Sequence, residues 1–193
     1  MRTTAPATQV LFEPFALGPL RLRNRLIMAP MGTCLDEGGH ITDATIAYYR
    51  RRAEGGVGTI TVEGCLVSPG TLGPEPHISG PEYLPGLKRL VDALRPYDVT
   101  VGVQLMHPGR QVVAGPTVAP SPVPLNSRAP IPHELSIAEI EEIVADYARA
   151  TELAEEAGFD FVEVSDHFHL GERAGTFRLR VLDRETILVK PGT

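Results

Sequence analysis

The sequence has few residues of the kinds that would indicate a metal cluster, a disulfide framework or a membrane segment. Its 193 residues include no tryptophan and two cysteines, Cys34 and Cys65, which form no CxxC pair. No stretch approaches the roughly 20 apolar residues of a membrane span, and residues 1–10 lack the apolar centre of a signal peptide. We therefore expect a cytoplasmic protein with reduced thiols, no membrane partner and no bound metal.

Positive charge is also scarce. The 18 Lys and Arg residues are outnumbered by 24 Asp and Glu, and the only run of cations is Arg50, Arg51 and Arg52. Nucleic-acid binding needs a broad basic surface, so nucleic acid is not an expected partner. The balance of 42% hydrophobic and 22% charged residues fits one globular domain rather than a disordered or fibrous chain.

Short apolar runs alternate with amphipathic segments along the chain. Strands are predicted at 24–30, 57–63, 99–106 and 159–164, and helices at 42–54, 83–97 and 136–158. Thr42 is the predicted cap of the first helix, and Ser136 with Glu139 forms a capping box for the third. The inward residues predicted for the last two helices are Leu84, Leu87, Leu90, Val91 and Leu94, then Ile140, Ile143, Val144, Tyr147 and Ala154. This order predicts an α/β fold with a parallel sheet covered by helices.

A doubly wound sheet and an eight-stranded barrel both fit that alternation. A doubly wound nucleotide-binding fold usually carries GxGxxG after its first strand, but the turn here reads PMGT at 30–33, which favours the barrel. Barrel active sites lie at the carboxyl ends of the strands, here residues 29–34, 63–65 and 104–110. Glu63 lies deep in this region and needs a partner such as an arginine, for which Arg25 is a candidate.

The strand ends carry small residues next to single polar groups. Ala29, Gly32 and Gly64 would let the backbone approach a flat aromatic ligand, and the Gln104 amide can donate and accept at a pyrimidine-like edge. Taken singly, the glycines are more simply explained as turn formers. Taken together with the segments around them, they have a further explanation.

Four segments in order carry a family resemblance: LFEPFALGPLRLRNRLIMAPM from Leu11, ITDATIAYYRRRAEGGVGTITVEG from Ile41, VGVQLMHPGR from Val101 and APSPV from Ala119. They resemble the Old Yellow Enzyme family of FMN-dependent ene-reductases, and PHELSIAEIEEIVADYARATELAEEAGFDFVEV is most similar to its 2,4-dienoyl-CoA reductase branch. The resemblance covers about 11–164. It implies a partial TIM (β/α)8 barrel of about four βα units, a single incomplete FMN-binding domain over 1–193 with a divergent tail at 165–193.

The resemblance also implies site residues, with no catalytic residue assigned. The flavin contacts would be Ala29, Pro30, Met31 and Gly32 after the first strand, Gly64 beside the ring, and Gln104 at the pyrimidine side. Weaker candidates for substrate binding are Cys34, near where some relatives carry a tyrosine, and His107 and Arg110 of the QLxHxGR pattern, for which loop scaffolding is an equal alternative. The implied cofactors are FMN and, as electron donor, NAD(P)H.

The stretch SDHFHL at 165–170 departs from the family. The expected histidine pair and tyrosine that hold the substrate are missing, and the following motifs of the second half are not found, as a frameshift, truncation or recombination would produce. In an extended segment His167 and His169 point opposite to Asp166, so three metal ligands do not converge and solvated histidines are the preferred interpretation.

Two functional hypotheses follow. The first is an ene-reductase-type oxidoreductase that passes hydride from NAD(P)H through flavin to an activated C=C bond of an enone or dienoyl thioester. The second is a truncated noncatalytic fragment or interaction module that does not complete the flavin site alone. Half a barrel would leave two open strand edges, so we expect a homo-oligomer or a complementing chain as partner, besides a small-molecule substrate. The native substrate and the choice between NADH and NADPH do not follow from the sequence.

Overall fold

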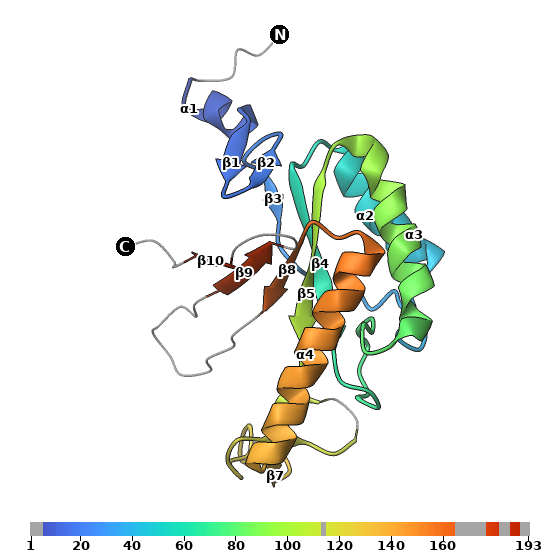
Figure 1. Cartoon of the computed structure of the whole chain (residues 1–193), viewed down its shortest axis with the longest axis vertical. Coiled ribbons are helices and arrows are strands. Elements are labelled where there is room, and N and C mark those ends of the chain that lie inside the picture. Colours follow the sequence, from blue (N-terminus) through green and yellow to red (C-terminus); the bar gives the residue numbers. More distant parts are fainter. Residues whose placement is uncertain (1–5, 113–114, 165–176, 182–185, 190–193) are drawn as a thin grey trace.

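A six-stranded sheet forms the centre of the molecule (Figure 1). The computed structural model describes residues 6–112, 115–164, 177–181 and 186–189. In the order β10-β9-β8-β5-β4-β3, the strands are Thr186–Val189, Phe177–Val181, Phe161–Val164, Thr100–Met106, Thr59–Leu66 and Ile27–Met28. The strands β3, β4, β5 and β8 are mutually parallel, and each pairs with the next strand of this series. This arrangement confirms the predicted α/β fold.

Three long helices cover one face of this sheet (Figure 1). They are α2 (Asp43–Glu54), α3 (Leu84–Leu94) and α4 (Ile137–Ala157), and α3 packs against both of the others. The shorter elements are α1 (Pro6–Gln9), η1 (Val10–Phe12), β1 (Phe15–Leu17), β2 (Leu20–Leu22), η2 (Pro81–Tyr83), η3 (Arg95–Tyr97), η4 (Gly109–Gln111), β6 (Val118–Ala119) and β7 (His133–Glu134). The hairpin of β1 and β2 was not among the predicted elements.

The predicted helix starts are confirmed. The Thr42 hydroxyl accepts from the Thr45 N–H at 3.2 Å. At the start of α4, the Ser136 N–H and hydroxyl both donate to the Glu139 carboxylate at 2.7 Å, completing a capping box. Because the backbone and hydroxyl of Ser136 stabilise the charged form, the pKa of Glu139 falls to about 2. The helix ends at Gly158, whose φ of 91° is the left-handed conformation typical of a helix C-terminus.

The hydrophobic core lies between the sheet and the helices. Leu87, Leu90, Val91 and Leu94 are at most 2% exposed, as predicted for α3. The prediction for α4 was wrong at Val144, which is 64% exposed. Ala154 is buried as predicted, and the other buried residues of α4 are Asp146, Ala150 and Ala157. Alanines at this spacing let the helix pack close to the strands, and the larger Val144 faces outward.

Two of the predicted strands differ from the observed ones. The first is shorter than 24–30, and its Ile27 is 58% exposed rather than fully buried, because β3 lies at the edge and pairs only with β4 among the described strands. The second begins at Thr59 and runs to Leu66, so residues 63–65 lie inside the strand. A register shift between Val62 and Gly64 makes Glu63 the extra residue of a β-bulge.

The end of the sheet beyond β8 is also different from the expectation. The strand β9 pairs antiparallel with β8, and β10 pairs antiparallel with β9. The outer edge of β8 is therefore paired, and the two edge strands of the described sheet are β3 and β10. The candidate ligands Asp166, His167 and His169 lie outside the described residues.

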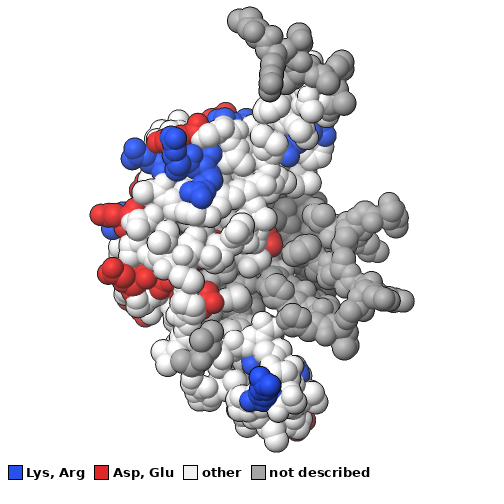
Figure 2. Space-filling view, turned by 180° about the vertical axis from the view of Figure 1, so that it is seen from behind, with Lys and Arg blue, Asp and Glu red and all other residues white. Residues whose placement is uncertain are grey.

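Surface charges of both signs lie next to each other (Figure 2). Arg50 and Arg51 both pair with Glu54, at 3.1 and 3.3 Å, so part of the only cationic run is paired within α2. In the part of the chain that the structure describes, no three His, Cys, Asp or Glu residues are grouped as metal ligands would be. Among the same residues, no helix is long and apolar enough to cross a membrane.

Candidate functional site

The bulge in β4 brings three site residues to one level across the sheet. The strand pairing sets Gly64 of β4 opposite Gln104 of β5, and Gln104 opposite Glu163 of β8. Side chains alternate between faces along a strand, and the neighbours Cys65, Leu105 and Val162 belong to or adjoin the helix-side core. Without the extra residue, Glu63 would occupy the position opposite Gln104. With it, the glycine takes that place, on the face away from the helices.

Gln104 is only 9% exposed and has a defined orientation. Its Nε2 donates to Glu163 Oε1 at 3.0 Å. A Cβ added at Gly64 would lie 3.3 Å from Gln104 Oε1 and 3.1 Å from Met106 Sδ, so a side chain here would require these two neighbours to shift. Burial raises the pKa of Glu163, while hydrogen bonds from Gln104 and Thr61 work in the opposite direction. Glu163 was not among the predicted site residues.

The turn after β3 presents the other predicted flavin contacts. Ala29 is exposed, Pro30 is half-buried and Met31 is 61% exposed. A Cβ built on Gly32 would meet no atom within 4 Å, so the space beside this backbone is open. Since β3 and β4 are neighbouring parallel strands, this open backbone and Gly64 belong to the same carboxyl edge of the sheet.

Glu63 holds this turn in place from the neighbouring strand. Its fully buried carboxylate accepts from the Thr33 N–H at 2.6 Å and from the Thr33 hydroxyl at 2.7 Å. The hydroxyl of Tyr49 in α2 donates to the same carboxylate at 3.1 Å. The suggested partner Arg25 was wrong, because its guanidinium lies over the Phe15 ring, 4.6 Å from the centroid. Thr33 and Tyr49 were not predicted as part of the site.

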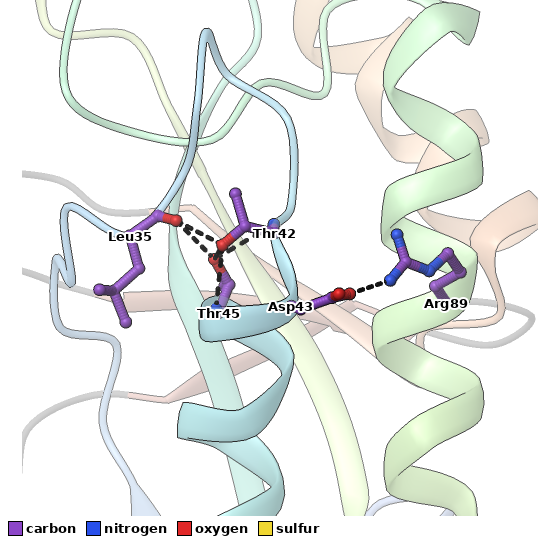
Figure 3. A network of polar contacts seen from close by, with 5 residues as sticks. All are labelled: Leu35, Thr42, Asp43, Thr45 and Arg89. Carbon is purple, nitrogen blue, oxygen red and sulfur yellow. Dashed lines mark hydrogen bonds and ion pairs between the residues drawn. The ribbon is translucent and has the colours of Figure 1, made fainter.

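The far end of the same loop is fixed to the start of α2, which is in turn paired with α3 (Figure 3). The Thr42 and Thr45 hydroxyls donate to the Leu35 carbonyl at 2.6 and 3.1 Å. Asp43, which follows the cap, pairs with Arg89 of α3. Between the anchors at Thr33 and Leu35 lies Cys34, an exposed residue with a φ of 53°. A left-handed conformation is unusual for cysteine, and the hydrogen bonds on both sides hold it there.

The predicted residues beyond β5 make contacts within their own loop. The Gly109 N–H donates to His107 Nδ1 at 3.2 Å, and Arg110 Nη1 donates to the Val123 carbonyl at 2.7 Å. Burial lowers the pKa of His107, with Asp146 of α4 acting in the opposite direction. These contacts fit loop scaffolding, and a role of Cys34, His107 or Arg110 in substrate binding stays a prediction.

The donor set at the carboxyl edge fits a planar heteroaromatic ring. Gly32 offers open backbone, Gly64 places no side chain between the strand and the Met106 and Gln104 side chains, and Gln104 supplies a buried amide with a donor and an acceptor. A side chain at Gly32 would enter the open space that such a ring could occupy. These residues could therefore hold the isoalloxazine of FMN along its face and at one edge.

Comparison with known proteins identifies the family. Residues 10–168 match the NADH:flavin oxidoreductase / NADH oxidase family. The chain belongs to this family. The match covers every predicted flavin-contact residue, and it ends close to the point where the family resemblance stops in the sequence.

Individual relatives give the extent of the similarity. The chain is 40% identical over 160 residues to a metal reductase of Desulforamulus reducens, covering 80% of this chain and 24% of the relative. It is 39% identical over 165 residues to an NADPH dehydrogenase of Listeria monocytogenes serotype 4a, covering 80% and 47%. Among solved structures, morphinone reductase superposes with a TM-score of 0.74 at 30% identity, over 80% of this chain and 47% of that protein. The chain therefore spans about half the length of the NADPH dehydrogenase and of morphinone reductase, and its sheet matches roughly half of their barrel fold.

Proposed function

We propose that this chain contributes to an FMN-dependent oxidoreductase of the ene-reductase type. Bound FMN would carry hydride from NAD(P)H to an activated C=C bond, in an enone or a dienoyl thioester. The observation that carries the proposal is the placement of Gly32, Gly64 and Gln104 at one carboxyl edge of a parallel sheet, within the family-matched residues.

The chain's own residues would bind and orient the flavin. The open backbone at Gly32 and the glycine at position 64 would admit the ring, and Gln104 would hydrogen-bond its pyrimidine edge. A hydrogen bond at that edge changes the electron density of the ring, so the amide would also tune the cofactor's potential. Glu63 accepts two hydrogen bonds from Thr33 and so holds the turn that carries Gly32 against β4.

A second candidate is a noncatalytic fragment or interaction module. It is favoured by the antiparallel pairing of β9 on β8, at an edge where a closed parallel barrel would have its next parallel strand. The same candidate predicts no saturable flavin binding and no turnover.

Titration of the full chain with FMN separates the two candidates. We expect saturable quenching of flavin fluorescence, and weaker binding by Gly32→Ala, since the added methyl enters the space proposed for the ring. This substitution leaves the protein contacts unchanged, because nothing lies within 4 Å of the new Cβ, so its unfolding midpoint should be no lower than that of the parent chain. Binding that is absent in the parent chain, or unaffected by Gly32→Ala, would contradict the proposed site.

Turnover then tests the chemistry. Flavin-loaded protein should oxidise NADPH or NADH in the presence of an enone or a dienoyl thioester and form the saturated product. We also propose that another copy or a complementing chain associates with this one and takes part in completing the site, because the edge strand β3 carries the exposed Ile27.

A further inference from the structure

Gln104 lies between two different neighbours in the site. Its amide nitrogen faces Glu163 of β8 and donates to Oε1 at 3.0 Å, while its amide oxygen faces Gly64 of β4. An ionised carboxylate only accepts hydrogen bonds, so the end of the amide that faces Glu163 has to be the NH2 group. The carbonyl is thereby turned toward the glycine, where the Met106 side chain is the other neighbour.

The surroundings of Glu163 support this role. It is half-buried on β8, with Thr61 of β4 and Gln104 of β5 as its hydrogen-bonding neighbours. Among the residues whose side chains the structure describes, which do not include those of β9 and β10, no charged group pairs with it. A half-buried carboxylate with only neutral donors depends on them for its stability. Its demand for donors therefore determines which way the Gln104 amide points.

We propose that Glu163 is a positioning residue that fixes the Gln104 carbonyl toward Gly64, so that the site selects a planar ring with an N–H donor at its edge. This inference rests on the proposed function and deepens it. For the isoalloxazine ring the matching donor is the N3–H of the pyrimidine part. An inverted amide would present N–H groups instead and would favour a ring edge made only of acceptors.

Flavin analogues test the selectivity. FMN and N3-methyl-FMN are titrated into three proteins: the parent chain, the Glu163→Gln variant and the Glu142→Gln control. Glu142 is an exposed residue of α4. In the parent chain and the control, methylation should weaken binding about tenfold, the effect of one lost hydrogen bond to a buried acceptor. In Glu163→Gln the amide can invert, and the difference should fall below about threefold. An equal ratio in all three proteins would overturn the proposal.

A second measurement needs no flavin. The side-chain NH2 resonance of Gln104 is followed by NMR in the ligand-free parent chain across pH 3 to 9. It should move with a single titration whose midpoint lies above the 4.5 of an ordinary glutamate, and the movement should vanish in Glu163→Gln. A Gln104 resonance that does not follow this titration would overturn the positioning role. Loss of FMN binding with the titration intact would instead contradict the proposed function and retain the positioning role.

Discussion

Tyr49 and Glu63 exchange two hydrogen bonds in the interior. The Tyr49 hydroxyl donates to Glu63 Oε1 at 3.1 Å and accepts from the Glu63 backbone N–H at 2.9 Å. Burial, with the adjacent carboxylate, raises the pKa of Tyr49, which keeps the phenol protonated as the donor. The pair joins α2 to the bulge of β4, and through Thr33 it reaches the turn that carries Gly32.

Removing the phenol tests this connection. Tyr49→Phe leaves the Glu63 N–H without its partner and takes one donor from the carboxylate, so it should lower the free energy of unfolding by about 1–3 kcal/mol. The measurement is urea unfolding followed by circular dichroism at fixed protein concentration. Tyr48→Phe is the matched control, because the Tyr48 hydroxyl makes no hydrogen bond to the described residues. Equal losses in both variants would contradict the assigned role.

Glu63 itself should control the turn after β3. In Glu63→Gln one acceptor oxygen becomes an NH2 group, which faces the Thr33 N–H or its hydroxyl, both of which donate to the parent carboxylate. We expect amide hydrogen exchange at Thr33 to accelerate about tenfold or more, because the turn opens more easily. Glu134→Gln, at an exposed position, is the control. Unchanged protection of Thr33 would show that the turn is held by other contacts.

The elements that sequence reasoning placed correctly are specified by neighbouring residues. Thr42 and Ser136 cap their helices through bonds that span three positions, and the apolar side of α3 repeats with the helical period. The strand ending at Met106 carries Val101, Val103 and Leu105 at alternate positions, which is the period of a strand. The signals for these elements are local, so one sequence suffices to find them.

The errors concern contacts between distant segments. The bulge at Glu63 depends on the Tyr49 and Thr33 side chains, which no local pattern connects to it. In α4 the periodic pattern placed Val144 inward, but the buried polar residue is Asp146, whose partner Ser68 is 78 positions away. Glu163 could have been found from one signal, an acidic residue in a strand of otherwise apolar residues.

The Ser68 and Asp146 contact should be a strong tertiary link. The Ser68 hydroxyl donates to Asp146 Oδ2 at 2.6 Å, and both residues are at most 9% exposed. Ser68→Ala removes a donor from a buried carboxylate and should destabilise the chain by about 1.5–3 kcal/mol in urea unfolding. Ser127→Ala, at an exposed loop position, should change stability by less than about 0.5 kcal/mol. Similar effects of the two substitutions would mean that Asp146 is satisfied by Arg149 alone.

Two histidines should make the chain less stable in mild acid. Burial lowers the pKa of His77 and of His107 below the ordinary 6.5. At His77 the charges of Asp36 and Glu82 oppose this shift and His40 adds to it. At His107 the charge of Asp146 opposes the shift. Below pH 6.5 the unfolded chain therefore binds more protons at these positions than the folded chain. Their contribution to stability is complete above pH 6.5 and is lost as the pH falls toward the folded pKa values.

Unfolding free energies between pH 8 and pH 5 measure this effect. The free energy should decline below about pH 6.5, and His77→Asn should flatten part of the decline, whatever its effect on stability at pH 8. The slope is the relevant quantity, since the substitution also removes the stacking of His77 on Tyr83 at 5.0 Å. A decline equally steep in the variant would mean that His77 takes no part.

The open edge of β3 should cause self-association. Ile27 is 58% exposed on a strand with one neighbour among the described strands, and Phe12 and Phe15 nearby in the chain are 58% and 38% exposed. A charged residue at an edge discourages pairing between chains, so Ile27→Lys should shift the chain toward the monomer in sedimentation velocity experiments over a range of concentrations. Leu72→Lys introduces the same charge at a position that is 57% exposed outside the sheet, and it should associate like the parent chain. A parent chain that sediments as a monomer at every concentration would contradict this prediction, and would mean that the half-barrel surface is stable in water without a partner.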